Sequence, residues 1–141
     1  MSNNKGSSEG IIPAGLLRKS ESASTTLRTE SAPGMEGKKL SEVKRSIEGT
    51  HAGRKEYEKI RTLAKKYNDH TFRDGPELTA EESAALAPFM GDENDYFVNV
   101  FLGAADGDRA PCVYWYGGEF YWNDGRWFRD GWFSFYRAVL K

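Results

Sequence analysis

The fold is decided by the stretch from Cys112 to Leu140, which reads CVYWYGGEFYWNDGRWFRDGWFSFYRAVL. Aromatic residues fill this stretch, and three dipeptides divide it: Gly117-Gly118, Asp124-Gly125 and Asp130-Gly131. Each dipeptide suits the positive φ angles of a two-residue hairpin turn. Aromatic runs separated by such turns predict an antiparallel meander.

Two-residue turns would also fix which residues lie opposite one another in this meander. The expected rows are Trp115–Phe120–Arg129, Tyr114–Tyr121–Phe128 and Val113–Trp122–Trp127. One face should pack against helices, and it carries Val113, Trp115, Phe120, Trp122 and Trp127. The other face is amphipathic, because a tyrosine ring offers flat apolar area while its hydroxyl stays in water. It carries Tyr114, Tyr116, Glu119, Tyr121, Arg126 and Phe128.

Before this stretch the apolar residues follow a helical period. Ser41 can cap a helix that ends near Gly49, and a second helix is expected from about Gly53 to Asn68. The second helix has an apolar stripe spaced by three and four residues, formed by Tyr57, Ile60, Leu63, Ala64 and Tyr67.

A third, short helix begins at the capping box Thr79-Ala-Glu-Glu82, and Pro88 should end it. Alternation then replaces the helical period, so Tyr96–Leu102 predicts a strand. The expected fold is therefore α+β, with two to three helices packed on a four- to five-stranded antiparallel meander and a disordered N-terminal tail.

Residues 1–39 differ in composition from the rest of the chain. They are rich in Ser, Gly and Thr, and the first aromatic residue of the chain is Tyr57. Such a segment buries too little apolar surface to offset the entropy of ordering. We therefore expect a disordered leader over 1–39 and a single compact α+β domain over 40–141. The leader is either a plain solvated segment or a delivery or partner-binding arm, with Ile11–Leu17 as a short contact motif.

Charge and cysteine content exclude several classes of function. Residues 41–73 carry nine basic and five acidic side chains, whereas residues 74–141 carry five basic and twelve acidic ones. The chain as a whole is therefore not a general polyanion binder. The single cysteine, Cys112, rules out an intramolecular disulfide and a multi-thiolate metal site. We expect no cofactor and no metal, because the sequence has no phosphate-binding glycine loop, zinc-ligand spacing or serine-nucleophile turn.

Apolar segments are too short to span a bilayer, so we expect no membrane partner. Cytoplasmic localisation is the expectation, and a single cysteine fits a reducing compartment. Export through a specialised secretion system, or action in a host cell, stays open because unstructured Ser-rich leaders also begin proteins exported by bacterial injection systems.

The amphipathic face of the predicted meander is the leading candidate for a binding surface. Flat aromatic rings with guanidinium groups are typical of protein interfaces. We expect a non-catalytic accessory, effector-like or regulatory protein that binds another protein through this face or through the sheet edge. The expected partner-binding residues are Tyr114, Tyr116, Tyr121, Arg126 and Arg129. The alternative is a sheet that is buried on both sides, with these residues in its core.

The predicted second helix offers a different function, nucleic-acid binding. Its cations that would contact phosphates are Arg54, Lys55, Lys59, Arg61, Lys65 and Lys66. Two other interpretations stay open, a solvated helix face and docking onto the acidic part of the same chain.

An enzyme of unknown class is the third hypothesis. A Cys112 nucleophile activated by His70 beside Asp69 is conceivable, although a buried thiol is the ordinary role for a cysteine in such a strand. Asp106 and Asp108 suit a turn better than a cation site, because the other ligands of a calcium loop are missing. No catalytic residue is assigned.

Overall fold

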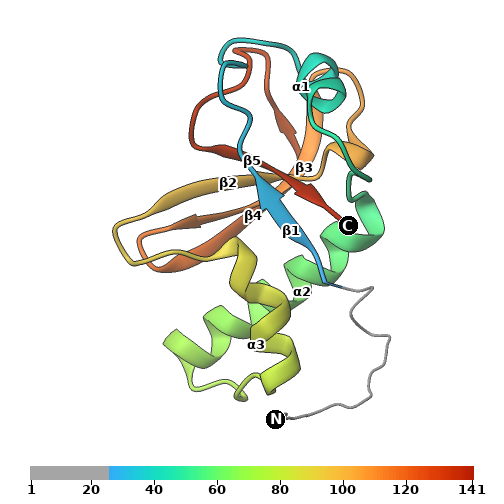
Figure 1. Cartoon of the computed structure of the whole chain (residues 1–141). Coiled ribbons are helices and arrows are strands. Elements are labelled where there is room, and N and C mark those ends of the chain that lie inside the picture. The colour runs from blue at the N-terminus through green and yellow to red at the C-terminus, as the bar shows by residue number, and fades with distance from the viewer. Residues whose placement is uncertain (1–25) are drawn as a thin grey trace, which may run out of the picture.

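A five-stranded sheet forms the centre of the computed structural model, which describes residues 26–141 (Figure 1). The strand order is β1-β5-β2-β3-β4. The strands are β1 (Arg28–Glu30), β2 (Tyr96–Val100), β3 (Arg109–Tyr116), β4 (Glu119–Trp127) and β5 (Tyr136–Leu140). Together with three α-helices this sheet confirms the α+β prediction.

The meander covers three strands and not the whole sheet. β2, β3 and β4 are consecutive and antiparallel, but β5 pairs with β2 in parallel, and β1 pairs with β5. The predicted hairpin at Asp130-Gly131 is therefore wrong. Gly131 has a φ of +88° and lies so close to the backbone of Gly37 that a side chain would collide with it. The Trp132 amide then donates to the Lys38 carbonyl at 3.0 Å, which leads the chain away from β4.

The dipeptide Asp124-Gly125 also forms no hairpin, because β4 runs through it as a bulged strand. Pairing shifts from Cys112↔Asn123 to Ala110↔Arg126, so β4 carries one extra residue at this point. The residue of β3 that lies between the two pairs is Pro111, which has no amide hydrogen for the ladder.

This bulge decides which predicted rows are right. The pairs Trp115–Phe120, Tyr114–Tyr121 and Val113–Trp122 are confirmed. The third members, Arg129, Phe128 and Trp127, were placed wrongly, since Trp127 pairs with Arg109 instead. Trp127 is consequently 46% exposed and does not pack under the helices as predicted.

The helices are α1 (Leu40–Ser46), α2 (Arg54–Arg73) and α3 (Ala80–Leu86), and short 3-10 turns lie at η3 (Ala87–Phe89) and η4 (Leu102–Ala104). The capping box at α3 is confirmed, because the Glu82 amide donates to Thr79 Oγ1 at 3.1 Å and the Thr79 amide donates to Glu82 Oε1 at 2.9 Å. α2 is longer than predicted and ends where Asp74 adopts a left-handed φ of 57°.

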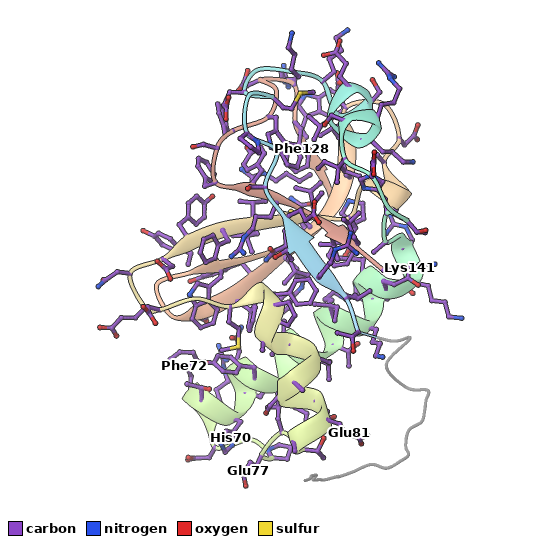
Figure 2. The ribbon with its side chains drawn as sticks, in the orientation of Figure 1. His70, Phe72, Glu77, Glu81, Phe128 and Lys141 are labelled. Atoms are coloured by element: carbon purple, nitrogen blue, oxygen red, sulfur yellow. The ribbon has the colours of Figure 1, made fainter. Side chains whose placement is uncertain are left out.

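The sheet is covered on both faces, but unequally (Figure 1). α2 and α3 pack on one face, where Tyr57, Ile60 and Leu86 meet the strand residues Val113, Trp115 and Phe120. On the other face, α1 and the loop after β4 bury a second cluster that includes Val43, Trp132, Cys112, Phe128 and Tyr136. Figure 2 shows Phe128 near α1, whereas His70 and Phe72 lie at the far end of the molecule.

The folded domain includes residues before residue 40. Strand β1 at Arg28–Glu30 pairs with β5, and Leu27 and Ala32 are buried. The last part of the predicted leader is thus part of the sheet, because a neighbouring strand supplies the pairing that its own composition does not indicate. Residues 1–25, with the motif Ile11–Leu17, lie outside the described residues. Between residues 26 and 141, no helix has the length and apolar character needed to cross a membrane.

Candidate functional site

The amphipathic face of β3 and β4 is buried at one end and open at the other. Phe128 belongs to the second core cluster and is 3% exposed, whereas Tyr116 is 59% and Tyr121 38% exposed. The reason is that α1 and the loop after β4 cover the half beyond the bulge, while the half beside the Gly117-Gly118 turn has no such cover. The sequence allowed two interpretations of this face, an exposed binding surface and a buried core face, and each of them describes one part of it.

Six aromatic rings follow one another across the open part, and we call them the aromatic face: Tyr96, Tyr114, Tyr116, Tyr121, Phe133 and Phe135. Along the row from Tyr121 to Phe133, neighbouring ring centroids are 4.8 to 6.4 Å apart. Tyr114 stacks on Tyr121 at 5.5 Å. The rings come from β2, β3, β4 and the loop before β5.

The loop that supplies two of these rings is held to the sheet. The Val98 amide donates to the Phe135 carbonyl at 3.1 Å, and the Tyr136 amide donates to the Phe133 carbonyl at 3.0 Å. Phe135 also lies 4.8 Å from Tyr96, centroid to centroid. The aromatic face is thus a preorganised surface, and little side-chain or backbone ordering would accompany binding.

Arg126 borders the aromatic face at its inner end. Its guanidinium lies 5.4 to 5.7 Å from the ring centroids of Phe128, Tyr136 and Tyr114. Among residues 26–141 it forms no ion pair with a carboxylate. This half-buried guanidinium also lies beside the Tyr96 hydroxyl and the Cys112 thiol, and its five N–H groups include further donors for another acceptor.

Four of the five predicted binding residues therefore lie together: Tyr114, Tyr116, Tyr121 and Arg126. The fifth, Arg129, lies elsewhere, 5.3 Å from the Trp127 ring centroid. The guanidinium of Arg109 lies 4.2 Å from the same ring. Sequence reasoning missed Tyr96, which depends on the pairing of β2 with β3, and it missed Phe133 and Phe135, which depend on β5 returning beside β2.

One carboxylate, that of Glu119, marks the outer end of the aromatic face. The Tyr121 hydroxyl donates to Glu119 Oε1 at 3.3 Å, and burial together with Glu119 raises the pKa of Tyr121. The hydroxyl therefore stays protonated at neutral pH. Glu93 lies against Gly118 in the β3–β4 turn. Neither Glu93 nor Glu119 pairs with a Lys or Arg of the described part of the chain.

Side chains of α2 occupy part of the outer edge of β4. Asn68 Nδ2 donates to the Phe120 carbonyl at 2.8 Å, and the Phe120 amide donates to Asn68 Oδ1 at 3.1 Å. Farther along, Arg54 donates to the Asp124 carbonyl at 3.2 Å. Asn68 occupies the edge as a neighbouring strand would. Its position in the apolar stripe of α2, eight residues after Ile60, is the signal that could have identified it.

The bulge in β4 is tied to α2 through the Asp124 carboxylate. The Tyr57 hydroxyl and Arg61 Nη1 both donate to Asp124 Oδ1, the latter at 3.0 Å. These two hydrogen bonds hold the pKa of Asp124 below its usual value, with the Tyr57 bond the larger cause. The tether fixes where β4 changes register.

The basic residues of α2 mostly serve the fold. Arg54 and Arg61 hold the bulge, Lys65 Nζ lies 2.8 Å from Asp69 Oδ2, and Lys66 Nζ lies 2.8 Å from Glu82 Oε1. The other two cations of the predicted phosphate track are Lys55 and Lys59. They line a groove of about 370 Å³ together with Leu27, Glu56, Ile60, Ala85 and Lys141. Three cations and one carboxylate around a small groove do not make a continuous phosphate track.

The hypothetical nucleophile and base lie apart. Cys112 is buried in the core cluster beneath α1, and burial raises the pKa of its thiol to about 11 despite Arg126. His70 lies on α2, which packs on the opposite face of the sheet. Asp106 and Arg109 pair across a tight turn. Within 26–141, no group of three or more His, Cys, Asp or Glu side chains is placed to hold a metal ion.

Rings, hydroxyls and one guanidinium give the aromatic face the means to bind by packing and hydrogen bonding. No protein-family model matches the chain, and no curated protein or solved structure matches it.

Proposed function

We propose that the chain is a non-catalytic accessory, effector-like or regulatory protein that binds another protein through its aromatic face. The observation that carries this proposal is the uninterrupted row of rings from Tyr121 to Phe133 on a sheet surface. A contiguous exposed apolar patch is uncommon on a monomer and marks interaction surfaces.

The residue types also fit an interface. Tyrosine and arginine are enriched among residues that dominate binding energy, and Tyr116, Tyr121 and Arg126 gather here. Because the sheet holds these side chains in place, their burial by a partner is opposed by little conformational entropy. A central tyrosine at such an interface typically contributes about 2 kcal/mol, or roughly 30-fold in Kd.

The test compares two variants of the full chain. Tyr116→Ala combined with Tyr121→Ala removes the two exposed tyrosines, and Trp127→Ala is the matched control because it removes a ring of similar exposure at the other end of β4. Tagged proteins are incubated with lysate of the native host, with nuclease and in high salt, and the partner found is then purified and its Kd measured.

We expect one partner to bind the wild type and the Trp127→Ala variant with similar Kd, and the double variant at least about 30-fold more weakly. Equal affinity of the double variant, or recovery that depends on nucleic acid, would overturn the proposal. Circular dichroism of each variant shows that a loss of binding is not a loss of folding.

A further inference from the structure

We propose that the segment bound by the aromatic face is a proline-rich stretch in the polyproline II conformation that carries Lys or Arg. This inference rests on the proposed function and adds the class of partner to it. Three features support it, namely the partly occupied edge of β4, the spacing and hydroxyls of the rings, and the Glu119 carboxylate at the outer end.

An added β-strand is disfavoured as the bound segment. It would need the outward backbone groups of β4, but Asn68 occupies those of Phe120, and Arg54 occupies the carbonyl of Asp124. The other edge strand, β1, has only three residues. We therefore expect recognition to use side chains on the face of the sheet.

An extended helix without internal hydrogen bonds fits those side chains better than an α-helix does. A polyproline II segment advances about 9 Å per turn, so successive turns would meet about every second ring of the row from Tyr121 to Phe133, where neighbouring centroids are 4.8 to 6.4 Å apart. Its carbonyls have no internal partners, and the tyrosine hydroxyls and the Arg126 guanidinium supply donors for them. An α-helix presents no free carbonyls along its length and prefers an aliphatic groove.

Charge defines the rest of the ligand. Glu119 lies at the outer end without a cationic partner among the described residues. Its carboxylate favours a Lys or Arg that follows or precedes the proline-rich stretch, and it opposes the phosphates of a nucleic acid stacked on the same rings. The low entropy of the preformed polyproline II helix further favours binding to a rigid surface.

A peptide selection tests this directly. The full chain is immobilised and used to select from a phage library of short random peptides. Enriched peptides are synthesised, and their affinities are measured for the wild type, the Tyr116→Ala, Tyr121→Ala double variant, Tyr121→Phe, Glu119→Gln and Trp127→Ala. Each peptide is also made with its prolines replaced by alanine.

The expected result is a set of peptides with prolines at regular spacing and at least one Lys or Arg. Replacement of the prolines should weaken binding at least about tenfold. Glu119→Gln should weaken it about threefold and reduce its salt dependence, and Trp127→Ala should leave it unchanged. Tyr121→Phe should weaken it about threefold, because the ring remains and one donor is lost.

The opposing results separate the two proposals. Peptides that require Tyr116 and Tyr121 but contain no recurrent proline would overturn this inference and leave the proposed function standing. Peptides that bind the double variant as well as the wild type would remove the aromatic face as the site, and both proposals with it. A selection on the wild type that enriches no peptide would count against the polyproline ligand.

Discussion

The aromatic side chains on the sheet face opposite α2 form two halves, one buried and one exposed. Beyond the bulge, Phe128 and Tyr136 meet at 5.3 Å in a buried edge-to-face pair beneath α1. Beside the turn, Tyr116 and Tyr121 are also ring neighbours, at 6.4 Å, yet both are exposed. The difference lies in what covers each half. Aromatic density therefore identifies a surface that can be buried, and the connections of the fold decide whether it is already buried.

Phe128→Ala should produce the largest effect, because it removes a ring from the buried half. We expect the free energy of unfolding to fall by about 3–5 kcal/mol. Urea titration followed by circular dichroism measures it. If the loss were below about 1 kcal/mol, the buried half would be no more a part of the core than the exposed half, and the comparison would break down.

Asn68→Ala tests the closure of the β4 edge on which the exposed half depends. The substitution leaves the Phe120 amide and carbonyl without their partner, so we expect a loss of about 2–3 kcal/mol. An open edge should also promote self-association, which light scattering detects. Lys65→Ala, one helical turn earlier and exposed, is the control. Equal stability of the two variants would show that the edge does not need Asn68.

Asp124→Asn tests the bulge that separates the two halves. The wild type should be about 1 kcal/mol more stable at neutral pH, a modest value because the carboxylate is solvent-accessible. The pKa of Asp124 is lowered in the folded state, so its stabilising effect is complete above the usual pKa of an aspartate and is lost as the pH falls through the lowered value. Urea titrations across acidic pH should show the two proteins converging. A constant difference would mean that the ionised carboxylate is not what holds the bulge.

The smallest effect is expected on the surface of α2, the rival binding surface. Since four of the six predicted phosphate-contacting cations already have intramolecular partners, the chain should elute from heparin at low salt. Lys55→Ala combined with Lys59→Ala should leave the elution unchanged. Tight retention that depends steeply on salt and disappears in this variant would restore nucleic-acid binding as the leading hypothesis.

Local signals in the sequence predicted the parts of the fold that depend on local interactions. The capping box of α3 is recognisable from Thr79 and Glu82 alone, and the Gly117-Gly118 turn sets the pairing of Tyr114 with Tyr121. The dipeptide Asp124-Gly125 failed as a turn signal because the same residues suit a bulge. Only distant partners, Tyr57 and Arg61, select between these two outcomes.

Long-range pairing explains the other differences. The three residues of β1 have no strand signal of their own and become a strand because β5 lies beside them. The return of β5 to β2 likewise brings Phe135 to Tyr96, so half of the aromatic face was not predictable from the hairpin alone. The central tyrosines and Arg126 were predictable, since they depend on one turn and on alternation.

The division into a buried and an exposed half is tested most directly by the free energy of unfolding of the Tyr116→Ala, Tyr121→Ala double variant, measured beside that of Phe128→Ala. We expect the double variant to lose no more than about 1–2 kcal/mol of this free energy, because the two rings contact mainly one another and other half-exposed tyrosines. A loss as large as that of Phe128→Ala would show that the exposed half is core, and the binding surface proposed here would have to be abandoned.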